Sequence, residues 1–343
     1  MKKLLLSLCL IGAMLVAFAQ KPYKVVFYNL ENLFDTINDP NKNDEEYLPE
    51  GARKWTTYRY NQKLANMSRV LFDIAAEDRN FPAVIGVSEI ENRLVLEDLL
   101  ATQKLERTNY RIVHYDSPDR RGVDCAFFYR PDQFKLEGSE AHKISFPGQP
   151  NFLTRDLVAM WGKIEGEPFY FIVSHWPSRL GGKDRSQHSR DFVAAKCKHI
   201  CDSVRTANPA TKVVIMGDFN DDATDKSVTD VLGAKGNLKK LEKNDMYNPF
   251  YAMLKAGYGT LAYRDAWNLF DNIVMSENLA TGSTGALKVQ KKEGAKFYGN
   301  IFIRPYMVQQ EGQYKNYPLR SFVGSNFQNG YSDHFPVYIY IAK

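Results

Sequence analysis

Segments that are apolar along their length and polar at one end occur from the beginning of this chain to its last residues. Residues 23–29 read Tyr-Lys-Val-Val-Phe-Tyr-Asn, and residues 335–341 alternate in a similar manner. Such runs predict buried strands. The polar residues at strand ends extend from Asn29 to His334, and a site assembled from both ends of a chain requires both ends to fold together. We therefore expect a single domain over residues 20–343.

The pattern between these ends predicts an α/β fold. Apolar residues recur at helical spacing over residues 58–76, 94–105 and 186–204. Strand-like runs separated by turns follow one another between residues 110 and 173, and such a succession is typical of antiparallel sheet. Residues 277–331 are rich in Gly, Lys, Tyr and Asn. We expect them to form a long excursion near the active face.

Residues 1–19 have the composition of a secretory signal peptide. Lys2 and Lys3 precede an uncharged apolar run that ends at Phe18, and Ala17-Phe18-Ala19 places small residues where a signal peptidase needs them. The run is shorter than the ~20 residues that span a bilayer, which argues against the alternative of a membrane anchor. We expect a cleaved signal and an exported protein, periplasmic or secreted.

The overall composition excludes a mainly disordered chain, because 44% of the residues are hydrophobic and 25% are charged. The formal charge of +5 includes the two lysines of the signal, so the remaining chain carries 5 − 2 = +3. That excess is too small to indicate nucleic-acid binding by itself. Export leaves three cysteines, and we expect them to act as buried small hydrophobic residues rather than as metal ligands. They are Cys125, Cys197 and Cys201.

Acidic, amide and imidazole side chains recur at the ends of the predicted strands. Unpaired buried carboxylates are costly, so a convergent cluster of them implies a cation among them. Oxygen-rich ligand sets suit Mg²⁺, Mn²⁺ or Ca²⁺ rather than zinc. Histidines beside such an ion can transfer protons or stabilise an anion. The residues are Asn29, Glu89, His175, Asp218, Asn220, Asp271, Asp333 and His334.

Seven motifs, read in order along the chain, resemble those of the endonuclease/exonuclease/phosphatase superfamily, the deoxyribonuclease I-like hydrolases. Gly217-Asp218-Phe219-Asn220 and Ser332-Asp333-His334 are the most specific, and together the motifs cover nearly all of the chain after the signal. The others are Phe27-Tyr28-Asn29-Leu30, Gly86-Val87-Ser88-Glu89-Ile90, Arg121-Gly122-Val123-Asp124, Ser174-His175-Trp176-Pro177 and Asp271-Asn272-Ile273-Val274-Met275-Ser276.

The resemblance implies a four-layer sandwich, in which two mostly antiparallel β-sheets pack face to face with helices outside and the site lies at one edge. It also implies hydrolysis of a phosphate ester with a divalent metal, Mg²⁺ or else Mn²⁺ or Ca²⁺. By matching position, Glu89 is expected to be the principal metal ligand, with Asn29 and Asp333 near the same ion.

The remaining site residues follow from the same matching. Asp218 is expected to orient or deprotonate the attacking water with help from Asn220, and Asp271 to orient His334 in its charged form. His175 is the second histidine expected at the scissile phosphate. An arginine guanidinium group is expected to bind phosphate oxygens. Arg121 is the matching residue, although the adjacent Arg120 could align with the same position.

Three functions remain open from the sequence. The first is an exported nuclease, favoured by the basic residues Arg179, Lys183, Arg185 and Arg190 after His175. The second keeps the same residues for a lipid or inositol phosphate, which an exposed aromatic rim in the excursion would favour. The third, a non-catalytic binding module, does not explain the full set of catalytic residue types. No protein partner is predicted. The rim candidates are Phe297, Tyr298, Phe302 and Tyr306, which could equally stack on bases.

Overall fold

The computed structural model describes residues 22–343 and consists of two seven-stranded sheets packed face to face. Three neighbouring pairs are parallel, β1–β2, β7–β8 and β9–β10, and the other pairs are antiparallel, which confirms the expected sandwich of mostly antiparallel sheets. In order across the first sheet the strands are β14 (Lys288–Gln290), β18 (Val337–Ala342), β1 (Tyr23–Leu33), β2 (Val84–Ile90), β4 (Asp124–Tyr129) and β3 (Arg111–His114), with β15 (Gly299–Ile301) also paired to β18.

The second sheet contains the strands that supply most of the later site residues. Its order is β5 (Lys135–His142), β6 (Leu157–Ile164), β7 (Glu167–His175), β8 (Lys212–Asp218), β13 (Asp271–Ser276), β10 (Met246–Tyr247) and β9 (Ala234–Lys235). Two small hairpins stand apart from both sheets, one of β11 (Leu261–Tyr263) and β12 (Ala266–Asn268), the other of β16 (Phe322–Val323) and β17 (Asn326–Phe327).

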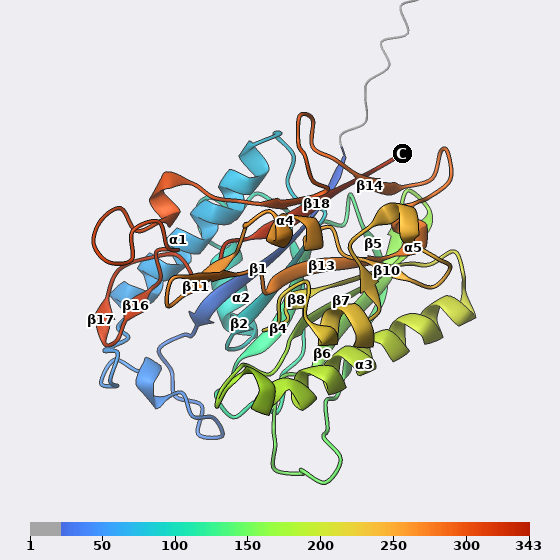
Figure 1. Cartoon of the computed structure of the whole chain (residues 1–343). Coiled ribbons are helices and arrows are strands. Elements are labelled where there is room, and N and C mark those ends of the chain that lie inside the picture. Colours follow the sequence, from blue (N-terminus) through green and yellow to red (C-terminus); the bar gives the residue numbers. More distant parts are fainter. Residues whose placement is uncertain (1–21) are drawn as a thin grey trace, which may run out of the picture.

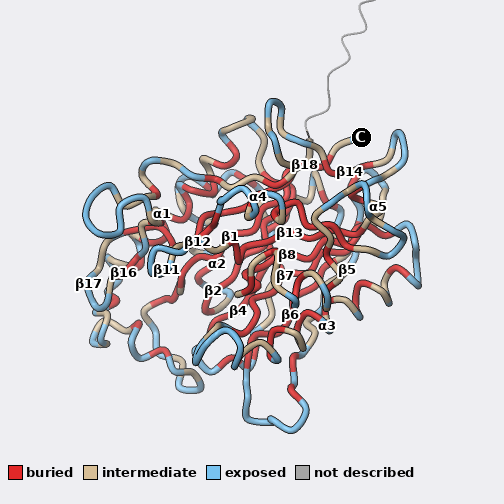
Figure 2. Tube along the Cα trace, viewed as in Figure 1, coloured by how far each residue is buried: buried red, intermediate tan, exposed pale blue. Residues whose placement is uncertain are grey.

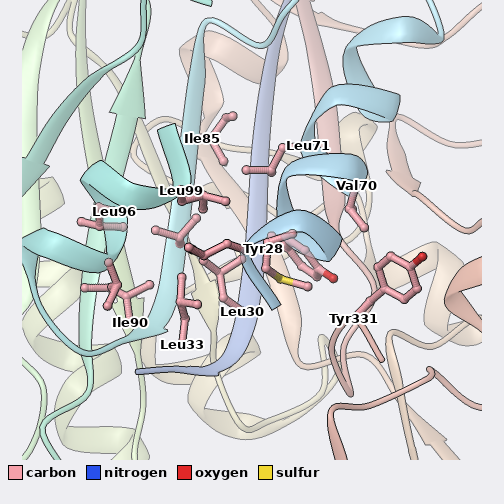
Figure 3. Close-up of a cluster of buried hydrophobic side chains, with 14 of the residues drawn as sticks. Tyr28, Leu30, Leu33, Val70, Leu71, Ile85, Ile90, Leu96, Leu99 and Tyr331 are labelled. Carbon is pink, nitrogen blue, oxygen red and sulfur yellow. The ribbon is translucent and has the colours of Figure 1, made fainter. Parts of the chain in front are cut away.

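Helices cover the outer faces of both sheets (Figure 1). The long helices α1 (Thr57–Ala76) and α3 (Lys183–Ala207) lie on opposite sides of the sandwich, and α2 (Arg93–Leu100) packs beside α1. Side chains of α1 and α2 meet those of β1 and β2 in one apolar cluster, which includes Val70, Leu71, Leu96, Leu99, Tyr28, Leu30, Ile85 and Ile90 (Figure 3). The shorter helices are α4 (Tyr251–Lys255), α5 (Glu277–Ala280), η1 (Glu45–Tyr47), η2 (Ser227–Val231), η3 (Leu238–Lys240) and η4 (Pro305–Met307).

The continuous apolar character of the central strands follows from burial on both faces. In β1, Val26 and Tyr28 face the helices, whereas Val25 and Phe27 belong to the cluster between the sheets. Burial is concentrated along these strands and exposure along the peripheral loops (Figure 2). The sheets approach closely at Gly86, where a Cβ atom would lie 2.5 Å from Sδ of Met216.

Two of the differences from the sequence-based expectation have a clear physical reason. α2 ends at Leu100 rather than at residue 105, because Leu105 contributes to the apolar cluster from a turn and not from a continuing helix. The structure also contains β5, a strand that the sequence did not predict. Its residues are mostly half-exposed and lack the apolar alternation of the other strands.

Part of the segment 277–331 joins the first sheet, since β14 and β15 both pair with β18. The predicted signal peptide lies outside the described residues. Within residues 22–343, no helix is both long and apolar enough to cross a membrane. All three cysteines of this part of the chain are free and buried, as expected.

Candidate active site

Strand register brings three predicted site residues side by side in the second sheet. Asp218 is the last residue of β8, and it pairs with His175 on the parallel neighbour β7 and with Asp271 on the antiparallel neighbour β13. A carboxylate, an imidazole and a second carboxylate therefore stand at one edge of three adjacent strands. All three residues are buried.

The first sheet contributes Asn29 and Glu89 from positions where its pairing is irregular. The register between β1 and β2 shifts after Asn29, and that between β2 and β4 shifts around Glu89. Glu89 has a φ angle of 58°, a left-handed conformation that is unusual outside glycine. Such bulges re-aim a side chain, and here Oε2 of Glu89 accepts a hydrogen bond from the backbone N–H of Asn32 at 3.1 Å.

Asn29 connects the two sheets directly. Its Nδ2 donates to Oδ2 of Asp218 at 3.1 Å, and its Oδ1 accepts from the backbone N–H of Glu31 at 2.9 Å. The hydroxyl of Ser332 donates to the backbone oxygen of Asn29 at 2.7 Å and accepts from the backbone N–H of His334 at 3.1 Å. These bonds hold the ends of the first and last strands against Asp218.

His334 lies between two carboxylates. Its Nδ1 is 2.8 Å from Oδ2 of Asp271, and its Nε2 is 3.8 Å from Oδ2 of Asp218. Burial alone would lower the pKa of His334, but the charges of Asp271 and Asp218 outweigh burial and raise that pKa well above its usual value. This imidazole is therefore positively charged at neutral pH.

His175, in contrast, is a neutral imidazole. Burial, reinforced by the cationic side chains of Arg155 and Arg121, holds its pKa well below the usual value. Its Nε2 lies 3.5 Å from Oδ2 of Asp218 and 3.8 Å from Oε1 of Glu89, and its buried Nδ1 has no hydrogen-bond partner. One neutral and one charged imidazole thus face the same aspartate.

The pKa of Asp218 lies near neutral pH. Burial raises its pKa to about 7; the positive charge of His334 opposes this rise and the negative charge of Asp271 adds to it. Oδ1 of Asp218 accepts from the backbone N–H of Asn220 at 2.9 Å, while Nδ2 of Asn220 donates to the backbone oxygen of Trp176 at 2.9 Å. A carboxylate with such a pKa can accept a proton at physiological pH.

Among the predicted site residues, Glu89, His175 and Asp218 form a group whose ligand atoms all lie within 4.8 Å of one another. Two carboxylates with an imidazole fit a divalent cation. The predicted ligand Asn29 contacts Asp218 through its amide, and the predicted ligand Asp333 instead accepts from Nη2 of Arg320 at 2.7 Å. The metal set Glu89, Asn29 and Asp333 stays a prediction, and His175 is a further candidate.

The two adjacent arginines have separate surroundings. Nη2 of Arg120 donates to the backbone oxygen of Asn151 at 3.1 Å. Arg121 is half-exposed and acts electrostatically on His175. Arg121 is therefore the member of the pair whose charge reaches the predicted site.

Several basic residues after His175 are paired within the protein. Nη2 of Arg179 lies 2.8 Å from Oδ2 of Asp225, and Nε of the fully buried Arg190 lies 2.8 Å from Oδ2 of Asp221. Lys183 also pairs with Asp225. These contacts favour a structural role for Arg179, Lys183 and Arg190 over the phosphate contacts that the sequence left open.

Sequence reasoning missed two charged groups at the site. Arg155 is buried, with Nη2 donating to the backbone oxygen of Trp176 at 2.7 Å and Nη1 to Asp119 at 3.1 Å. Glu31 is buried beside Lys63 and Arg320. Glu31 is two residues beyond Asn29, so the strand-end rule could have found it; a single arginine before β6 gave no comparable signal.

Comparison with solved structures identifies the same fold in several proteins. The D. rerio TDP2 complexed with a single-strand DNA product has a TM-score of 0.54 at 16% identity, covering 94% of this chain and 100% of that chain. The human Nocturnin catalytic domain with bound sulfate has 0.54 at 15% identity, covering 94% of each chain. The Bacteroides thetaiotaomicron mannosyl-6-phosphatase has 0.53 at 16% identity, covering 94% and 100%.

No curated protein matches the chain by sequence. The model of the Endonuclease/Exonuclease/phosphatase family matches residues 24–343, nearly the whole chain and all of the motifs that converge at Asp218. This protein belongs to the endonuclease/exonuclease/phosphatase family.

Proposed function

We propose that this protein is an exported, divalent-metal-dependent phosphodiesterase that hydrolyses nucleic-acid phosphodiester bonds. The observation that carries the proposal is the arrangement around Asp218, where a proton acceptor lies within 4 Å of one neutral and one charged imidazole. In-line displacement at phosphorus needs a positioned water molecule, a group that accepts a proton from that water, and positively charged groups beside the phosphate oxygens. The family membership supports hydrolysis of a phosphoric ester.

Each side chain has a role in this proposal. Asp218 orients and deprotonates the attacking water, with its orientation set by the hydrogen bonds from Asn29 and Asn220. His334, held by Asp271, places a positive charge beside the phosphate. Neutral His175 can donate one N–H to a phosphate oxygen, and the half-exposed Arg121 can add a forked donor set.

The metal would be held by Glu89 as principal ligand, with Asn29 and Asp333 as the further predicted ligands and with Asp218 close enough to contact the same ion. When bound, such an ion offsets negative charge on the phosphate. Mg²⁺ is the expected ion, with Mn²⁺ or Ca²⁺ as alternatives.

Two observations favour nucleic acid over a lipid or inositol phosphate. The four aromatic residues of the excursion do not form an exposed rim, because Phe302 is buried and Phe297, Tyr298 and Tyr306 pack against the apolar clusters. A structural neighbour was solved with a single-strand DNA product. Export is part of the proposal and rests on the signal-like composition of residues 1–19.

The test is incubation of the purified protein with plasmid DNA, RNA, sphingomyelin and bis(p-nitrophenyl) phosphate, each with Mg²⁺ and with chelator. We expect nucleic-acid cleavage that chelation abolishes and that Asp218→Ala and His334→Ala each reduce by ~100-fold or more. His188→Ala, on the exposed part of α3, is the matched control and should retain activity. Cleavage of sphingomyelin alone would replace the nuclease assignment with a lipid phosphodiesterase.

A further inference from the structure

A cavity of about 350 Å³ opens beside the candidate active site and has aromatic walls. We call it the aromatic cleft and define it by Tyr263, Arg264, Tyr314, Tyr317, Arg320 and Asp333. One wall is the β11–β12 hairpin, and the other is the segment of the excursion that precedes Asp333. Asp333 adjoins His334 in the chain, so the cleft begins at the residues proposed to act on the phosphate.

Two aromatic side chains of the cleft are exposed to solvent. Tyr263 is 63% exposed and Tyr314 is 43% exposed, which is unusual for large apolar groups in a chain whose other aromatic residues are mostly buried. Exposed rings beside a phosphate-directed site offer faces on which a flat ligand can stack. This chemistry requires rings that are held in place before the ligand arrives.

Hydrogen bonds connect the two walls of the cleft into one frame. The hydroxyl of Tyr317 donates to Oδ1 of Asp265 at 2.5 Å and accepts from the backbone N–H of Asp265 at 2.7 Å, which ties the excursion to the hairpin. Arg264 and Asp265 form the hairpin tip with φ angles of 49° and 63°. The rings of Tyr314 and Tyr317 lie 5.7 Å apart.

The frame is also attached to the catalytic residues. Trp267 of β12 stacks on Phe335, with ring centroids 6.2 Å apart, and the backbone N–H of Phe335 donates to the oxygen of Thr260 at 2.8 Å. Phe335 directly follows His334. These contacts hold the β11–β12 hairpin next to His334, as a subsite adjoining a reacting phosphate requires.

Charge and polarity distinguish the cleft from a lipid-binding groove. Arg320 is half-exposed, donates to Asp333 at 2.7 Å and also lines a second cavity of about 200 Å³ on the side of Glu31. Arg264 and Asp265 stand at the mouth beside Gln309 and Gln313. These groups match the polar edges of a nucleobase and the phosphate next to it, whereas an acyl chain would leave them unpaired.

We propose that the aromatic cleft binds the base of a nucleotide that flanks the scissile phosphate, stacking it on Tyr263 or Tyr314 while Arg320 faces the adjoining phosphate. The inference rests on the proposed nuclease function and deepens it by adding a base-binding subsite. It makes the base, and not only the phosphate backbone, a determinant of turnover.

The test compares two single-stranded oligonucleotides of equal length, oligo(dT) and a polymer whose residues all carry tetrahydrofuran in place of the base. Both have the same phosphates, so they separate base stacking from charge. We expect the wild-type protein to cleave oligo(dT) at least tenfold more efficiently in kcat/KM. The double variant Tyr263→Ala/Tyr314→Ala should lose roughly tenfold or more on oligo(dT), and its rate on the abasic polymer should stay unchanged.

Two further variants keep the interpretation specific. Tyr263→Phe/Tyr314→Phe retains the ring faces and should restore the preference for oligo(dT). Tyr58→Ala removes a tyrosine of α1 that is 68% exposed and lies outside the cleft, so it should behave as wild type. Equal losses of the alanine double variant on both polymers, or equal wild-type rates, would overturn the base-binding subsite.

Binding measured without turnover separates this inference from the proposed function. In chelator, fluorescence anisotropy of labelled oligo(dT) and of the labelled abasic polymer reports affinity while hydrolysis is stopped. We expect tighter binding of oligo(dT), lost in the alanine double variant. Preferential binding without cleavage in Mg²⁺ would contradict the nuclease assignment and leave the cleft supported. Cleavage of both polymers at equal rates, with equal affinities, would contradict only the cleft.

Discussion

Nδ1 of His334 lies 2.8 Å from Oδ2 of Asp271, although the two residues are 63 positions apart in the chain. Asp271 begins β13 in the second sheet, and His334 precedes β18 in the first. The contact is therefore made between the sheets, at the edge where both strands meet Asp218. It makes the charge of one imidazole depend on how the sandwich is assembled.

Replacement of Asp271 by Asn should lower the pKa of His334, because the negative charge that raises it is removed. His334 then loses its proton at lower pH, so the alkaline limb of the kcat/KM profile should move toward acid. Activity at pH 8 should fall roughly 10- to 100-fold. NMR titration of the His334 ring in chelator reports the pKa directly. Asp132→Asn, on the surface beside Arg130, is the control; an unchanged His334 titration in Asp271→Asn would refute the coupling.

Glu89→Gln should weaken divalent-metal binding, since it removes one of the two carboxylates in the donor group of Glu89, His175 and Asp218. Calorimetric titration with Mn²⁺ should show at least a tenfold weaker affinity, and Mg²⁺-dependent hydrolysis should drop ~100-fold or more. Glu137→Gln changes a surface carboxylate paired with Lys163 and should leave both measurements as in wild type. Unaltered Mn²⁺ affinity in Glu89→Gln would remove Glu89 from the ligand set.

Glu91→Gln should stabilise the protein above pH 5. Burial raises the pKa of Glu91 to about 8, with the negative charges of Asp35, Asp44 and Asp39 adding to the rise. In the unfolded chain this group ionises near its ordinary pKa of 4.5. Between pH 4.5 and 8 folding therefore requires the uptake of a proton. The wild type accordingly loses stability as pH rises from 4.5 toward 8, and glutamine does not titrate.

The stability difference between Glu91→Gln and wild type should reach the order of a few kcal/mol at pH 8 and become small at pH 4.5. Urea unfolding in chelator at both pH values measures it. Glu97→Gln, an exposed carboxylate of α2, should show no such pH-dependent gain. The expectation fails if Glu91→Gln and wild type differ equally at the two pH values.

Gly217→Ala should disrupt the site through the backbone. A Cβ atom at Gly217 would lie 2.0 Å from the backbone oxygen of Ser174 and 2.8 Å from its Oγ, so β7 and β8 would have to separate where they carry His175 and Asp218. We expect a loss of unfolding free energy above ~3 kcal/mol, or failure to fold. A melting temperature within a degree or two of wild type would show that the strands can shift without cost.

The fold could be predicted to a large extent because its evidence is local. The apolar run over residues 23–29 became part of β1, since strands buried on both faces need continuous apolar sequence. β5 was missed because its half-exposed residues carry no such pattern. Leu105 misled the prediction for α2, since an apolar residue in a packed turn has the same spacing as one in a helix.

By itself, the sequence determined which polar groups end the strands and to which family their order belongs. Only the tertiary structure decided that His175 is neutral, that Arg320 pairs with Asp333, and that the basic residues after His175 are largely neutralised by Asp221 and Asp225. The physical reason is the separation along the chain of the residues on which each property depends. Strand formation depends on neighbours in the chain, whereas the charge state and availability of a side chain depend on burial and on groups brought close from remote strands.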